Sequence, residues 1–201
     1  MPAFGQVPVY STDVGNLSGG SADPHWSLTG ANIPSQGQSA TVLSGGALYG
    51  TWPADTAQSG WIGVVNSETQ PSAPYNFTES FSMAGLQLSS AVISGFWSLD
   101  DYGQLFVNGI AVSSAGAGGP SPYWGHEMSF TVPDADLVQG INTLTVQMQS
   151  SDDNYDGIRV EFDTATANAI TNGVPDASST ALLLGVASAA LAAARRMKRR
   201  T

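Results

Sequence analysis

The stretch QLFVNGIAV, residues 104–112, decides the fold prediction. Its Asn108-Gly109 pair lies between two apolar runs, LFV and IAV. Asn-Gly favours the two-residue turn with positive φ at both positions, whose twist matches that of paired strands. The stretch therefore predicts a tight antiparallel β-hairpin centred on these two residues.

Similar alternating runs precede and follow this hairpin, separated by turns rich in Gly, Pro, Ser and Asn. The predicted strands are HWSLT (25–29), ATVLS (40–44), GWIGVV (60–65), YNFTESFSMA (75–84), AVISGFWSLD (91–100), QLFVNGIAV (104–112), EMSFTVP (127–133), NTLTVQMQ (142–149) and GIRVEFDTA (157–165). In the run 142–149, Leu144, Val146 and Met148 can face one side of a sheet. Residues 134–139 can form one turn of helix. The predicted fold class is all-β, an antiparallel β-sandwich or jelly roll followed by one C-terminal hydrophobic helix.

Four of these segments carry a family resemblance. YNFTESFSM, AVISGFWSLDDYGQLFVNG, FTVPDADLVQGINTLTVQMQ and GIRVEF follow one another between residues 75 and 163. Their order resembles galactose-binding-domain-like β-sandwiches, a group that includes many carbohydrate-binding modules. The FVNG and GIN elements argue for the fold rather than for a ligand. We expect a sandwich domain at 21–167, an N-terminal extension at 1–20 and a linker at 168–173.

The charge of the chain is unevenly distributed. Residues 1–194 carry 16 acidic residues against Arg159 alone, a net charge of −15. Such a body repels nucleic acid and anionic membrane surfaces, so nucleic acid is excluded as a partner. The chain has no cysteine, which removes disulfides, Cys-zinc sites and thiol catalysis.

The chain ends VPDASSTALLLGVASAALAAARRMKRRT. Residues 179–194 form an apolar run long enough, with the small residues before it, for a short membrane helix. Its largest apolar side chains are Leu182, Leu183, Leu184 and Leu191. The basic cluster that follows would hold that end in the cytoplasm; it consists of Arg195, Arg196, Lys198, Arg199 and Arg200. The alternative is an Ala-rich helix packed on the domain.

The order of motif, helix and basic end resembles the PEP-CTERM sorting signal, and VPDASSTALLLG is closest to its VPD variant, VPDSG-CTERM. Ala177-Ser178 stands where that variant usually has Ser-Gly. The resemblance implies that an exosortase reads Val174, Pro175 and Asp176 within a sorting signal at 174–201. It further implies an inner-membrane precursor and a mature protein at the cell surface or in the extracellular matrix of a Gram-negative-type bacterium, alongside exopolysaccharide and biofilm.

Such a tail requires export, yet the first residues, MPAFGQVPVYSTDVG, have no basic start and no apolar core of a signal peptide. We therefore expect a leader encoded upstream of Met1.

Residues 152–157, DDNYDG, suggest a cation site. Asp152, Asn154 and Asp156 are carboxylates and an amide at alternate positions, as in loops that bind Ca²⁺, and Asp163 falls at the twelfth loop position. The alternative is a polar turn between two strands. The sequence indicates no required cofactor, and it leaves both alternatives, a structural calcium ion and a polar turn, in place.

Aromatic side chains suggest a sugar site. Trp52, Tyr123 and Trp124 fall in loops beside Pro and Gly, where a large ring needs either a packing partner or a ligand. Trp61 and Trp97 fall inside apolar strands and are expected in the core.

Neither histidine, His25 nor His126, has a nucleophile motif around it. We therefore expect a non-enzymatic surface or matrix protein. A carbohydrate-binding module that recognises exopolysaccharide is the alternative, and a secreted hydrolase ranks third.

Overall fold

The asparagine–glycine hairpin forms as the sequence predicts. In the computed structural model, which describes residues 4–115, 123–150 and 154–170, Asn108 and Gly109 have φ of 51° and 81°. Val107 pairs with Ile110 across this turn. The hairpin joins strands β7 (Tyr102–Val107) and β8 (Ile110–Ala115).

Residues 1–169 form one compact unit, and residues 170–201 are a second unit. Besides β7 and β8, the strands are β1 (Phe4–Gln6), β2 (Ala22–Gly30), β3 (Gln38–Val42), β4 (Ile62–Gly63), β5 (Tyr75–Ser82), β6 (Val92–Asp100), β9 (Met128–Val132), β10 (Ile141–Gln149) and β11 (Gly157–Asn168). The short 3₁₀ helices are η1 (Gly45–Ala47), η2 (Leu88–Ser90), η3 (Tyr123–Gly125) and η4 (Asp134–Asp136). The helical turn predicted at 134–139 is therefore confirmed at η4.

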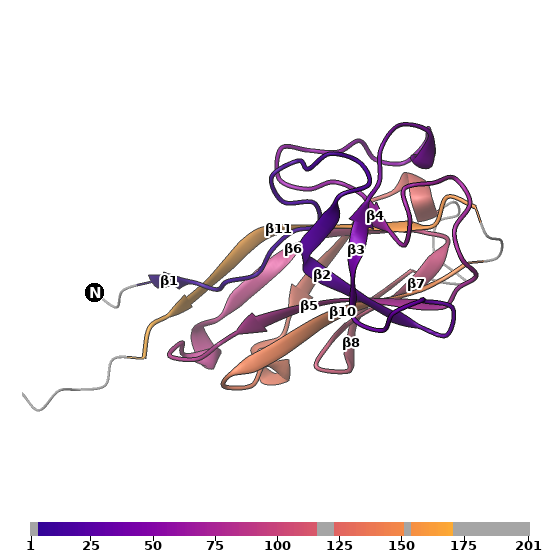
Figure 1. Ribbon diagram of the computed structural model, residues 1–201. Coiled ribbons are helices and arrows are strands. Elements are labelled where there is room, and N and C mark those ends of the chain that lie inside the picture. The colour runs from indigo at the N-terminus through magenta and orange to yellow at the C-terminus, as the bar shows by residue number, and fades with distance from the viewer. Residues whose placement is uncertain (1–3, 116–122, 151–153, 171–201) are drawn as a thin grey trace, which may run out of the picture. The chain divides into compact units, whose positions relative to one another are not determined.

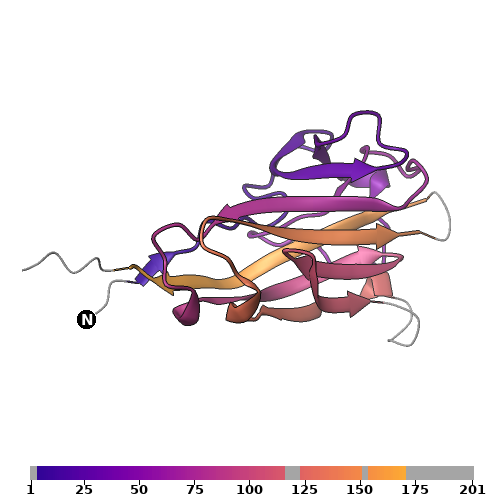
Figure 2. The same cartoon turned by 90° about the horizontal axis from the view of Figure 1, so that it is seen from below.

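The strands pair antiparallel in the order β8-β7-β10-β5-β2-β3-β4-β11-β6-β9, and β1 pairs with β11. Figures 1 and 2 show the sheet folded over on itself, with β2, β5, β10, β7 and β8 in one layer and β11, β6 and β9 in the other. The short strands β3 and β4 connect the two layers. This arrangement confirms the predicted antiparallel sandwich.

The core lies between the two layers and follows the period-two pattern of the strands. Leu144, Val146 and Met148 on β10 are all buried, as predicted, and so are Trp97 on β6 and Val160 on β11. Side chains of this size each stabilise the fold by about 1.5–3 kcal/mol on full burial. Trp61, also predicted as core, is buried in a separate small cluster with Trp52, Leu43 and Ala47.

The structure differs from the prediction at the N-terminus. Residues predicted as an extension belong to the compact unit: β1 pairs with the end of β11, and the backbone N–H of Thr12 donates to the carbonyl of Val160 at 2.9 Å. The Thr12 side chain is fully buried. The sequence does not predict this pairing, because β1 has only three residues, which is too few to show an alternation of apolar and polar side chains.

Strand β4 is also shorter than the predicted run 60–65. The side-chain oxygen of Gln70 accepts hydrogen bonds from the backbone N–H groups of Val64 (3.2 Å) and Val65 (3.1 Å). A side chain thus takes the place of a neighbouring strand at these two residues.

Candidate functional site

A cavity of about 270 Å³ opens at one end of the sandwich, where several loops meet. It is lined by Tyr49, Glu68, Asp100, Asp101, Trp124, Asn154 and Tyr155. Three of these residues have aromatic rings, three have carboxyl groups and one has a carboxamide. We call this cavity the end pocket.

Strand register brings the lining residues together. Asp100 ends β6 and pairs with Gly157, the first residue of β11, so Tyr155 and Asn154 lie just beyond the same sheet end. The N–H of Tyr155 donates to the carbonyl of Glu68 at 2.7 Å, and Thr69 forms an isolated β-bridge with Asn154. These backbone contacts fix the loop before β5 beside the loop before β11.

The aromatic side chains of the end pocket contact one another. The ring of Tyr49 lies 6.5 Å from Trp124, nearly perpendicular to it, and 5.1 Å from Tyr155. Tyr49 is 40% exposed, and Trp124 and Tyr155 are half-buried. The three rings therefore form a partly accessible apolar wall, which suits the apolar face of a ligand.

Trp52 lies beneath this wall. Its ring stacks on Trp61 with centroids 4.0 Å apart, and its side chain is only 8% exposed. Its indole N–H donates to Oδ2 of Asp100 at 2.9 Å. Of the two loop tryptophans predicted to contact sugar, the structure therefore places Trp124 in the pocket wall and Trp52 in the packing that supports it.

The carboxyl groups of the end pocket differ in environment. Burial raises the pKa of Asp100 to about 8; a hydrogen bond with Asp101 and the charges of Asp101 and Asp156 add to this, and the Trp52 N–H opposes it. Asp100 is therefore protonated at neutral pH, next to the more exposed Asp101. The proton of Asp100 is engaged in the hydrogen bond between the two carboxyl groups, and Asp101 offers acceptor oxygens to a ligand.

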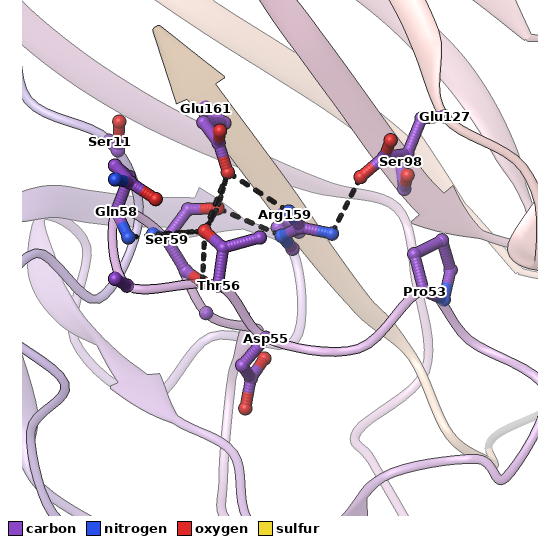
Figure 3. A network of polar contacts seen from close by, with 12 residues as sticks. Ser11, Pro53, Asp55, Thr56, Gln58, Ser59, Ser98, Glu127, Arg159 and Glu161 are labelled. Carbon is purple, nitrogen blue, oxygen red and sulfur yellow. Dashed lines mark hydrogen bonds and ion pairs between the residues drawn. The ribbon is translucent and has the colours of Figure 1, made fainter.

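A second polar cluster anchors the loop that carries Trp52 (Figure 3). Arg159 on β11 donates to Glu127 (2.8 Å), Glu161 (3.0 Å) and the Ser59 hydroxyl (2.8 Å). The hydroxyls of Ser59 and Thr56 each donate to Oε2 of Glu161 at 2.7 Å. Both hydroxyls belong to the loop after Trp52, so the cluster holds that loop against β11.

The predicted calcium ligands are only partly brought together. Asn154 lines the end pocket, and Asp156 is buried beside Asp100. Asp163 is exposed on β11, seven residues beyond Asp156; at about 3.3 Å per residue this places it more than 20 Å away. The reason is that β11 continues as one strand where a calcium loop would curl back. Asp152 lies outside the described residues.

Within residues 4–115, 123–150 and 154–170, three or more His, Cys, Asp or Glu side chains are nowhere grouped as metal ligands. The described donors, Asn154 and Asp156, are fewer than the six to eight oxygens that Ca²⁺ takes.

The two histidines are not part of the end pocket. His25 stacks on Tyr10, with ring centroids 3.6 Å apart. The backbone carbonyl of His126 accepts a hydrogen bond from Ser98 at 2.8 Å.

Sequence reasoning missed Tyr49, Glu68 and Tyr155. For Tyr155 the sequence does contain an indication, because it lies between Asn154 and Asp156 in a predicted polar turn. Such turns can hold a non-glycine residue at positive φ, and the φ of Tyr155 is 55°. Tyr49 and Glu68 had no such indication, since their place depends on contacts between distant loops.

The sorting residues Val174, Pro175 and Asp176, the leucines of the predicted membrane helix and the basic cluster all lie outside the described residues. In the part of the chain that the structure covers, every helix is too short or too polar to cross a membrane.

Comparison with known proteins gives two findings and one negative result. Residues 173–198 match the VPDSG-CTERM motif. No curated protein matches the chain significantly. Among solved structures, a family 35 carbohydrate binding module from an environmental isolate is similar, with 18% sequence identity and a TM-score of 0.29, over 55% of this chain and 78% of that one.

The motif match confirms the resemblance that the C-terminal residues carry. A tag of this kind indicates an exported, surface-targeted protein. The chain thus combines an antiparallel β-sandwich with a C-terminal VPDSG-CTERM sorting motif.

Proposed function

We propose that this chain is a non-enzymatic, exported protein that binds exopolysaccharide at the cell surface or in the extracellular matrix, through the end pocket. The single observation that carries the sugar-binding part is the pairing of an aromatic wall with carboxyl and amide groups in one cavity. The apolar face of a pyranose ring packs on aromatic rings, and its hydroxyls both donate to and accept from such polar groups.

A glycan array tests the sugar-binding part. The full chain is applied in a polyoxyethylene detergent, which has no sugar headgroup, together with Trp124→Ala. We expect the wild-type chain to bind a subset of microbial glycans and Trp124→Ala to lose that binding. Equal signals from the two proteins, or no signal from either, would remove the end pocket as a sugar site.

The sorting part of the proposal rests on the C-terminal motif. An exosortase would read Val174, Pro175 and Asp176 while the hydrophobic helix holds the precursor in the inner membrane of a Gram-negative-type bacterium. Release or attachment outside the cell would follow, beside biofilm polysaccharide. Mass spectrometry of the mature C-terminus in the native host tests this, since an intact RRMKRRT end in the extracellular fraction would contradict it.

Hydrolysis is the weaker candidate. Glycosidases hold two carboxyl groups about 5–9.5 Å apart, on either side of the bond they cleave. Asp100 and Asp101 instead hydrogen-bond to each other, which suits a shared proton rather than separate acid and base roles. We therefore propose binding without cleavage, and release of reducing ends from a bound glycan would overturn this choice.

Calcium remains a prediction at the loop that contains Asn154 and Asp156. Calorimetry of the full chain checks it: binding heat together with a rise in melting temperature at millimolar Ca²⁺ would support the ion, and the absence of both would remove it.

A further inference from the structure

The end pocket has a strongly one-sided charge. Its walls contain Glu68, which is exposed, and Asp101, which is half-buried, and Asp156 lies buried close to Asp100. Arg159 is the only Lys or Arg among residues 1–194. Its guanidinium is 4% exposed and paired with Glu127 and Glu161, so it offers no charge to a ligand.

An anionic sugar is therefore disfavoured. A uronate or a sulfated ring in the pocket would bring its charge close to carboxylates, and the described lining includes no Lys or Arg, so the like charges would repel. A neutral sugar would use the rings and the hydrogen-bonding groups but leave the negative potential unused.

We propose that the end pocket takes a sugar ring bearing a free ammonium group, as part of an amino-polysaccharide. This rests on the proposed sugar-binding function and names the ligand class. An ammonium has three N–H donors and no acceptor, which complements acceptor-rich carboxylates. The rings of Tyr49, Trp124 and Tyr155 line the same pocket, and contact of the ammonium with a ring face would add a second attraction, since aromatic faces are electron-rich.

The rest of the body supports the same ligand class over longer distances. With a net charge of −15 over residues 1–194, it attracts a polycationic chain from solution and raises the rate of encounter. This long-range part is screened by salt, with a Debye length of about 8 Å at physiological ionic strength, whereas contacts inside the pocket are screened less.

The test compares two oligosaccharides that differ only in charge and acetylation. Isothermal calorimetry with the full chain in polyoxyethylene detergent uses a β-1,4-linked glucosamine hexamer and the N-acetylglucosamine hexamer of the same linkage. The buffer contains EDTA and is held at about pH 5, low enough to keep the sugar amines protonated. We expect the glucosamine hexamer to bind roughly tenfold more tightly or better, and this ratio to shrink as salt is added.

Variants assign that preference to the pocket. Asp101→Asn removes a carboxylate from the pocket wall and should bring the affinity ratio close to one. Asp134→Asn is the matched control: it removes an exposed carboxylate on η4, which does not line the pocket, and should leave the ratio unchanged. Thermal melting of both variants checks that each is folded.

The outcomes separate this inference from the proposed function. Equal binding of the two hexamers would leave the sugar site in place and overturn the ammonium assignment. A preference that Asp101→Asn and Asp134→Asn reduce equally would also overturn it, because the effect would then come from overall charge. Binding of neither hexamer overturns it too, and the glycan array then shows whether the end pocket binds another sugar.

Discussion

The indole Nε1 of Trp52 donates a 2.9 Å hydrogen bond to Oδ2 of Asp100, joining a loop to the end of β6 across 48 positions of sequence. Trp52 also stacks on Trp61, and Trp124 and Tyr155 of the end pocket pack against the cluster that these two rings belong to. The two loop tryptophans have similar sequence surroundings but different structural roles, since Trp52 supports the pocket and Trp124 lines it.

Trp52→Phe should therefore affect stability first. It keeps an aromatic ring against Trp61 but leaves Asp100 without its indole donor, so the free energy of unfolding should fall by about 1–2 kcal/mol. Urea denaturation measures this. Trp124→Ala is the comparison, and it should lose glycan binding while costing less stability. Trp52→Phe with unchanged stability would show that the hydrogen bond contributes little.

Two substitutions in the Arg159 cluster should lower the free energy of unfolding by different amounts. Arg159→Met leaves Glu161 and the loop hydroxyls without their buried cation and should destabilise the protein by about 3–5 kcal/mol. Glu127→Gln removes a partner whose side chain is 43% exposed, and should cost about 1 kcal/mol or less. Denaturation curves of both variants check this order, and a larger loss for Glu127→Gln would contradict the account of the cluster.

Stability should fall as the pH rises above neutrality. Burial raises the pKa of Glu79, in the core on β5, from 4.5 to about 8; the backbone of Tyr10 opposes this and the charge of Asp23 adds to it. The folded state therefore holds a proton that the unfolded state has lost. The contribution of this proton to stability is complete below about pH 4.5 and disappears as the pH rises through about 8. The contribution of Asp100 depends on pH in the same direction.

Glu161 does not reverse this trend. Burial alone would raise its pKa, but hydrogen bonds from Ser59, Thr56 and Arg159 lower it, so its stabilisation is already present above about pH 4.5. Between about pH 5 and pH 9 the melting temperature should fall, and Glu79→Gln should flatten the profile. A melting temperature that is constant or rises over this range would contradict the protonation of Glu79 and Asp100.

The hairpin offers a backbone test. Gly109 has a φ of 81°, so Gly109→Ala forces a side chain into the left-handed region and should cost about 1–2 kcal/mol, although nothing lies within 4 Å of the added Cβ. Gly46→Ala is the matched control, because the space there is also open and φ is not positive. Equal melting temperatures of the two variants would contradict the turn assignment.

The strands could be predicted because their information is local. Asn108-Gly109 sets the turn, and the alternation of Leu144, Val146 and Met148 sets the buried face of β10. The GIN element also proves structural: Asn142 is fully buried, its oxygen accepts from Asn108 and the N–H of Val138, and its amide donates to the carbonyls of Val138 and Gly140.

The end pocket could not be predicted to the same degree. Trp124 was identified because a loop tryptophan needs a partner, but Tyr49 and Glu68 become neighbours of Asp100 only when β3, β4, β6 and β11 have paired. The separation of Asp163 from Asp156 likewise follows from β11 running on as one strand. Contacts between residues far apart in the sequence leave no local pattern, and the end pocket depends on contacts of this kind.

The most direct test follows the indole N–H signals of the five tryptophans by ¹⁵N–¹H NMR while a glycan ligand from the array is added. The reporters are Trp26, Trp52, Trp61, Trp97 and Trp124. Ligand in the end pocket should change the indole N–H chemical shift of Trp124 most and that of Trp52 next. The signals of Trp26 and Trp97 should stay unchanged, because their indoles donate to Tyr10 and Ser113, which do not line the pocket. Shifts at Trp26 or Trp97 with Trp124 unchanged would contradict the end pocket as the binding site.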